Sequence, residues 1–394
     1  MVVDVTERDD NGATALHYLA LIPMPSEYNI FGAIISLAEV LGNRSGNSYS
    51  SRTRTERENK RENIKQIARR LLDKGVSINA RDNQGNTPLH WAVRQKNFPF
   101  ANYLIELGAD INIRGNNGKS LLHEAAQTGD LELIEWLIAR NIDVNIQDND
   151  NSNCLVFAAS WGKIDVIKPL IEAGVQINHV DNQGYTPLVW AVKNRHKNTA
   201  EELIKYGANK WFKDRYGKNL LHHAVDNNCY SIFRLILNIW NKDQILSDLI
   251  IWLKEQGLNI NEKDNDGLTP FNYAIEKGNF NLADTLINLG AGWRTCDHQG
   301  NTCLHRAVDT YNPKIETIKW LINRGLNINE KNQEGLTPLM LAFKRDDMNL
   351  ARTLINLGAD INEQNNSGES ALLQAIKSGN PQLVRQLIEL GANK

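Results

Sequence analysis

Short apolar segments and polar turns alternate along the chain with a period of 33 residues. The stretch from Asp82 to Ile113, DNQGNTPLHWAVRQKNFPFANYLIELGADINI, shows one complete unit: a polar turn, two apolar segments and a closing glycine. The turn position recurs ten times, at Gly12, Gly85, Gly118, Asn151, Gly184, Gly217, Gly267, Gly300, Gly335 and Gly368. A repeat of this period buries its apolar face only against its neighbours, so the pattern predicts a solenoid of ten units.

The residues that flank the apolar segments predict two short helices in each unit. A side chain that can cap a helix N-terminus precedes the first segment in all ten copies: Thr14, Thr87, Ser120, Asn153, Thr186, Asn219, Thr269, Thr302, Thr337 and Ser370. Proline follows at the first helical position in four copies, as at Pro88, where a missing N–H costs nothing. Glycine closes the second segment in nine copies and Asn141 in the tenth, as expected for a helix stop.

Two insertions interrupt the period and suggest the domain organisation. The first, at about 22–63, begins with an apolar segment and ends in a polar stretch of low complexity, for which we expect mobility. The second lengthens the sixth unit over 228–258 with helically spaced apolar residues, which predicts an extended outer helix and a change of curvature. We therefore expect repeats 1–6 in 1–227 and repeats 7–10 in 259–394.

The fixed letters of the unit resemble the ankyrin repeat, and the resemblance covers nearly the whole chain. It implies an all-α solenoid in which each unit is a β-turn followed by two antiparallel helices. It also implies that histidine at His17, His90, His123, His222 and His305 hydrogen-bonds the backbone of a neighbouring loop. In the family, the turn tips and the open side of the inner helices form a concave surface that contacts partners.

Composition excludes several classes of function. A net charge of −2 gives no bulk basic field, which disfavours nucleic acid as a partner. No apolar run approaches the ~20 residues of a membrane-spanning helix, and the N-terminus lacks a secretory signal, so we expect no membrane insertion and a cytoplasmic location. Four cysteines inside repeats suit a reducing compartment.

No catalytic or cofactor-binding motif is present. Cys296, His298, Cys303 and His305 form a zinc-like inventory. Their repeat positions point in different directions, however, so we predict no metal site.

The candidate partner-binding residues follow the concave surface of repeats two to six. Aromatic side chains ringed by polar groups are typical of interface hot spots. The candidates are Trp91, Gln95, Asn116, Lys119, Trp161, Tyr185, Trp190, Lys193, Asn194, Tyr216 and Lys218. For Trp91 and Trp190 the alternative is packing between repeats.

These observations predict a monomeric, non-enzymatic scaffold that binds another protein through the concave face, without a cofactor. The alternative is an ankyrin-repeat effector or adaptor that an intracellular bacterium delivers to the host cytosol, where it acts on a host protein. A third hypothesis, an enzyme built from the insertions, ranks last because about 40 residues are too few for an independent catalytic core.

Overall fold

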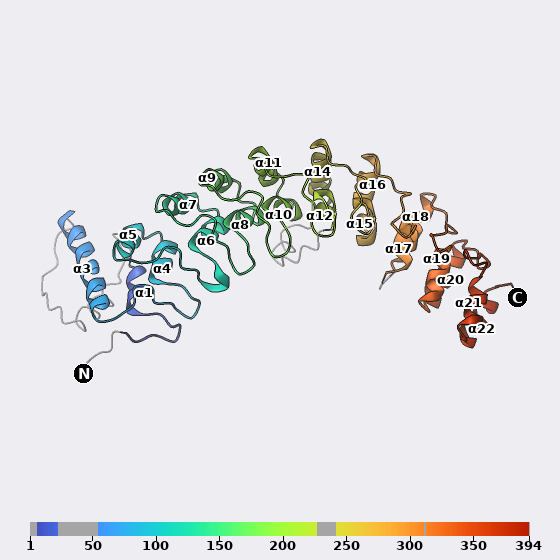
Figure 1. Ribbon diagram of the computed structural model, residues 1–394, viewed down its shortest axis with the longest axis horizontal. Coiled ribbons are helices and arrows are strands. Elements are labelled where there is room, and N and C mark those ends of the chain that lie inside the picture. The colour runs from blue at the N-terminus through green and yellow to red at the C-terminus, as the bar shows by residue number, and fades with distance from the viewer. Residues whose placement is uncertain (1–5, 23–53, 227–241, 311–312, 394) are drawn as a thin grey trace. The chain divides into compact units, whose positions relative to one another are not determined.

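A computed structural model describes residues 6–22, 54–226, 242–310 and 313–393 of the chain (Figure 1). These residues form helices joined by turns, with no strand among them beyond two isolated bridges, Cys296 to Thr302 and Gln364 to Ser370. The predicted all-α ankyrin solenoid is therefore confirmed. The apolar start of the first insertion and residues 228–241 of the second lie outside the described residues.

Each repeat contributes one inner and one outer helix. The inner helices are α1 (Ala15–Ala20), α4 (Pro88–Arg94), α6 (Leu121–Thr128), α8 (Cys154–Ser160), α10 (Pro187–Lys193), α12 (Leu220–Val225), α15 (Pro270–Lys277), α17 (Cys303–Val308), α19 (Pro338–Lys344) and α21 (Ala371–Lys377). The outer helices are α3 (Arg54–Asp73), α5 (Phe98–Glu106), α7 (Leu131–Ile138), α9 (Ile167–Glu172) behind the 3-10 turn η2 (Ile164–Val166), α11 (Lys197–Lys205), α14 (Lys242–Glu255), α16 (Phe280–Asn288), α18 (Ile315–Asn323), α20 (Met348–Asn356) and α22 (Pro381–Glu389).

Two helices bear on the predicted insertions. Helix α3 begins at Arg54 and not near Asn63, so the polar stretch 42–63, for which we expected mobility, is helical from residue 54 onward. Arg, Glu and Lys dominate that segment and have high helix propensity, which overrides the low complexity of the sequence. In the sixth repeat, the outer helix α14 has fourteen residues, compared with nine in α16 and in α18, and the predicted insertion over 228–258 stays a prediction.

The chain divides into two compact units. The first comprises Met1–Ala191 and Asn198–Ala208, and the second Val192–Lys197 and Asn209–Lys394. Within each unit the inner helices stand in one row and the outer helices in another, as α6 and α7 or α15 and α16 show (Figure 1). The predicted domain boundaries near 227 and 258 stay predictions.

The core of each unit lies between its two rows of helices. Leucine and alanine from both rows are fully buried, as at Leu89, Ala92 and Leu104 of the second repeat. Capping agrees with the sequence: Asn153 Oδ1 accepts the Val156 N–H at 3.1 Å, and Asp130 Oδ1 accepts that of Leu133 at 3.2 Å. Each such bond satisfies an N–H group that the helix leaves free.

Four of the five repeat histidines link their inner helix to the next turn. In His123, Nδ1 accepts the Ser120 N–H at 3.0 Å and Nε2 reaches the Ser152 carbonyl, 29 residues later, at 2.9 Å. His17, His222 and His305 make the same two bonds, to Asn86, Leu268 and Leu336 respectively. Their role is structural, as the resemblance implied. His90 departs from this pattern, because no hydrogen-bond partner lies against its buried Nε2.

Candidate partner-binding surface

The inner-helix tryptophans tie the turns to the helices. Trp91 is half-buried and its Nε1 donates to Asp82 Oδ2 at 2.9 Å, while Trp190 Nε1 donates to Asp181 Oδ2 at 2.6 Å. Burial by itself would raise the pKa of Asp82, but the bonds from Trp91 and from Asn86 hold that pKa below its ordinary value. These bonds indicate a structural role for both indole groups, and their contact with a partner stays a prediction.

The pairing of a turn aspartate with a residue nine positions later recurs along the chain. Tyr273 Oη donates to Asp264 at 2.6 Å, and His223 Nε2 lies 3.3 Å from Asp214 Oδ2, with both side chains buried. The sequence analysis did not recognise this pairing. Its signal was the spacing of nine residues between each turn aspartate and an aromatic or histidine donor.

Other candidates in the first unit present accessible side chains. Gln95 and Trp161 lie at the C-terminal ends of α4 and α8, and both are exposed, Trp161 by 55%. Thr128, at the end of α6, is exposed in the equivalent place, although the sequence analysis did not select it. Tyr185 is half-buried, with its ring 5.6 Å from that of Trp190. Lys119 is half-buried, with Nζ 4.6 Å from the centre of the Phe157 ring.

The remaining candidates belong to the second unit. Tyr216 is 59% exposed at a turn tip, whereas Lys193, Asn194 and Lys218 are half-buried. Lys218 Nζ forms an ion pair with Asp226 at 2.7 Å. The predicted line of residues is therefore divided between the two compact units, and each part is described within its own unit.

Sequence reasoning missed the exposed aromatic residue Trp211. Trp211, in the second unit, is 60% exposed and stands where most other repeats carry asparagine, as at Asn112 and Asn261. Its Cζ and Cη edge lies against Gly257, with 3.5 Å between Trp211 Cη2 and the position that a Cβ would take. The replacement of a repeated asparagine by tryptophan was the available signal.

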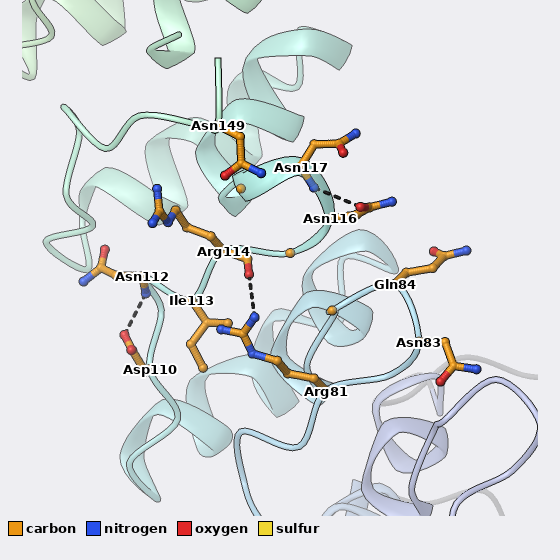
Figure 2. Close-up of a pocket in the computed structure, with 13 residues that line it drawn as sticks. Arg81, Asn83, Gln84, Asp110, Asn112, Ile113, Arg114, Asn116, Asn117 and Asn149 are labelled. Carbon is orange, nitrogen blue, oxygen red and sulfur yellow. Dashed lines mark hydrogen bonds between the residues drawn. The ribbon is translucent and has the colours of Figure 1, made fainter. Parts of the chain in front are cut away.

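A polar pocket opens among the turns of repeats two, three and four in the first unit (Figure 2). Its volume is about 540 Å³ and its lining includes Arg81, Asp110, Arg114 and Asn116. Of the predicted partner-binding residues, Asn116 alone lines it. Arg81 Nη1 donates to the Arg114 carbonyl at 3.2 Å, and Arg114 Nη1 donates to the Gln147 carbonyl at 2.9 Å, so both side chains are held in place along the turns.

The zinc-like residues are engaged elsewhere. Asn272 Nδ2 donates to Cys303 Sγ at 3.1 Å, burial raises the pKa of the Cys303 thiol to about 12, and both nitrogens of His305 are hydrogen-bonded. Within the described ranges, no group of three potential ligands converges on one point. In the same residues, no helix has the length and apolar character needed to cross a bilayer.

Comparisons with known proteins agree with this architecture. Family models of ankyrin repeats match residues 122–214, 155–248, 240–332 and 310–394, and a further ankyrin-repeat model matches 71–125. Mouse Rabankyrin-5 is 29% identical over 149 residues, which is 37% of this chain and 11% of that protein. The putative ankyrin repeat protein FPV034 of fowlpox virus is 30% identical over 137 residues, covering 30% of this chain and 31% of its own length.

The solved ankyrin repeat domain of human ASB11 matches with a TM-score of 0.47 at 24% identity, over 61% of this chain and 99% of that domain. This chain thus spans about a tenth to a third of the length of the two relatives named above. The ankyrin fold is typically a non-enzymatic module for protein–protein interaction. The family models cover well over half of the sequence, and the chain belongs to the ankyrin repeat family.

Proposed function

We propose that this protein is a non-enzymatic scaffold that binds another protein through the turn tips and inner-helix ends of repeats two to five. The observation that carries the proposal is the row of exposed side chains Gln95, Thr128 and Trp161 in the first unit. A tryptophan that is more than half exposed is costly to leave in water, and its burial in a partner's pocket is typical of an interface anchor. The polar residues beside it suit the rim of such an interface.

The effector hypothesis specifies the cell in which the protein acts, and it does not change the proposed binding surface. A scaffold that a bacterium delivers to a host cytosol would use the same row of side chains on a host protein.

The experiment is affinity capture from the cells that express the protein, followed by mass spectrometry and then by binding of the purified partner. The test variant combines Gln95→Ala and Trp161→Ala. The matched control combines Glu135→Ala and Glu172→Ala, which alter two exposed or half-buried positions of the outer helices α7 and α9. Both variants must keep the melting temperature of the wild type.

We expect the control to retain the partner and the test variant to weaken its binding by at least about tenfold, or 1.4 kcal/mol. A partner that both variants bind equally well would contradict the proposed surface. The proposal would also be contradicted if no captured protein, once purified, bound this chain directly.

A further inference from the structure

Neighbouring turns in the first unit are joined by a repeated backbone hydrogen bond. The Asn83 N–H donates to the Asn11 carbonyl at 2.7 Å, which joins turns one and two. Asn149 and Asn182 do the same for the next turns, to Asn117 at 3.0 Å and to Asp150 at 2.9 Å. Asparagine side chains reinforce the link, since Asn83 Nδ2 donates to the Asp10 carbonyl at 2.9 Å.

The junction between turns two and three lacks this link. The corresponding atoms are the Asn116 N–H and the Gln84 carbonyl, and no hydrogen bond joins them among the described residues. The Asn116 side chain is exposed, and its Oδ1 accepts the N–H of Asn117 at 2.9 Å. The pocket of Figure 2 lies at this open junction.

The cause is a glycine at the aspartate position of the third turn. In the second turn, Asp82 Oδ1 accepts the N–H groups of Gln84 and Asn86, at 2.9 and 2.8 Å, and so fixes the loop. Gly115 has no side chain to do this, and the loop closes instead as the 3-10 turn η1 (Asn116–Gly118) with Asn117 at a φ of 56°. In this turn Asn117 takes the left-handed conformation, and the Asn116 N–H makes no hydrogen bond with the Gln84 carbonyl.

A second hydrogen bond is missing at the same junction, at His90. Its Nε2 would be expected to reach the Lys119 carbonyl, by analogy with His17 and Asn86, yet it has no partner. Burial lowers the pKa of His90 to about 4. For His17 and His123 the bond to a neighbouring carbonyl opposes that lowering, so the missing bond at His90 is consistent with its low pKa.

The charges around the pocket are mainly positive. Arg81 and Arg114 are exposed on its lining, and each donates one guanidinium N–H to a backbone carbonyl, although a guanidinium carries five N–H groups. Asp110 is the single acid among the lining residues, and its Oδ1 already accepts the Asn112 N–H at 2.8 Å. The amide groups of Asn116 and Asn117 add neutral donors.

We propose that the pocket at Gly115 binds a glutamate or aspartate side chain from an acidic, extended segment of the partner protein. The fork of a guanidinium matches a carboxylate, and an arginine whose stem is already held by a hydrogen bond loses little entropy on binding. The segment's backbone has the Asn116 N–H and the Gln84 carbonyl to pair with, one donor and one acceptor. This inference rests on the proposed function and specifies the chemistry of the partner.

The experiment measures the binding of short fluorescent peptides to the full chain by anisotropy. One peptide carries four glutamates between glycine and serine residues, and its matched control carries four glutamines; both are capped and amidated. A third peptide carries the glutamines and a free C-terminal carboxylate. The protein variants are Arg114→Gln, Gly115→Asp and the control Arg8→Gln.

Arg8 is a close control because its Nη1 also donates to the backbone of the following turn, at Arg81, but the turn junction there is closed. We expect the glutamate peptide to bind the wild type at least about tenfold more tightly than the glutamine peptide. Arg114→Gln and Gly115→Asp should abolish this preference, the second because an aspartate there should hold the turn as Asp82 does and close the junction. Arg8→Gln should preserve it.

Several results would overturn the inference. They are equal binding of the two amidated peptides, no binding of either, and an equal loss in Arg8→Gln and Arg114→Gln, which would show only general attraction between charges. Equally tight binding of the peptide with the free C-terminus would assign the pocket to a chain end, and displacement of the glutamate peptide by a single-stranded oligonucleotide would assign it to nucleic acid.

The outcome can be separated from that of the proposed function. If Arg114→Gln still captures the partner and the Gln95 and Trp161 variant does not, the scaffold proposal holds and the acidic-segment inference fails. If Arg114→Gln alone loses the partner, the pocket is the main site and the proposed row of side chains is not.

Discussion

The junction between turns two and three and the junction between turns three and four are built from the same number of residues, yet one is open and the other closed. At the closed junction, Asn149 bonds the Asn117 carbonyl and His123 reaches Ser152. At the open junction neither equivalent bond is present, and a pocket of about 540 Å³ lies beside it. The later turn of the open junction has Gly115 where that of the closed junction has Asp148. Under the proposal above, a repeat scaffold gains a binding site when one turn loses an aspartate side chain.

The largest expected effect is the loss of unfolding free energy at low pH that His90, at the open junction, should cause. The folded-state pKa of His90 is about 4, below the ordinary value of about 6.5, so the unfolded chain binds more protons between these values and stability is lost as the pH falls from 6.5 towards 4. We expect His90 to account for a loss of roughly 2–3 kcal/mol at about pH 4.5 relative to neutral pH. The measurement is urea unfolding of the wild type and of His90→Asn at both pH values.

Asparagine is a suitable replacement because Asn272 occupies the same position in the seventh repeat, where its Oδ1 accepts the Thr269 N–H at 2.8 Å. The variant should lose less stability on acidification than the wild type. An identical loss in both proteins would contradict the role assigned to His90.

At neutral pH, replacement of the histidine should cost more stability at the closed junction than at the open one. His123→Asn breaks the bond to the Ser152 carbonyl and should cost about 1–2 kcal/mol, because that carbonyl loses a buried partner. His90→Asn breaks no bond across its junction, so it should cost about 1 kcal/mol less than His123→Asn. Equal costs in the two variants, measured by urea unfolding, would show that the closed bond adds nothing.

The helix stop of the third repeat offers a smaller effect. Gly129 ends α6 with a φ of 77°, in the left-handed region that an alanine adopts only with strain. Gly129→Ala should therefore cost about 1 kcal/mol. The equivalent residue of the second repeat, Lys96, already has a φ of 53°, and Lys96→Ala should change this backbone term little. Thermal unfolding of the two variants would test the difference, and equal melting shifts would contradict it.

The smallest effect should come from the ion pairs that cross from repeat two to repeat three. Lys96 Nζ lies 2.9 Å from Asp130 and 3.2 Å from Glu132, but its side chain is exposed. Surface pairs of this kind contribute little to stability and are screened by salt. Lys96→Met should melt with the wild type at physiological salt, and a clear destabilisation that salt removes would show that these pairs hold the open junction together.

The sequence predicted the regular parts of this molecule because they depend on local rules. Caps such as Ser120, stops such as Gly108 and the period of 33 residues act within one unit, and they were visible without coordinates. Trp161 and Asn116 were selected as candidates from their place in that repeat, and both side chains are exposed.

The pocket was not predicted, because it arises from a missing hydrogen bond between two neighbouring repeats. Gly115 is one more glycine in the sequence, and its effect becomes visible only when Asp82 is seen to hold two N–H groups of its own turn. The bond between Trp91 and Asp82 was also missed, because the sequence analysis treated tryptophan as a hydrophobic residue and did not consider its N–H donor.

The missing bonds between turns two and three also bear on how the first unit unfolds. In a solenoid each repeat is coupled only to its neighbours, so the free energy of unfolding is a sum of repeat terms and coupling terms along one dimension. A weak coupling lets the repeats on its two sides open independently, and amide hydrogen exchange detects such cooperative blocks. Repeats one and two should exchange as one block and repeats three to five as another, with the boundary at Gly115.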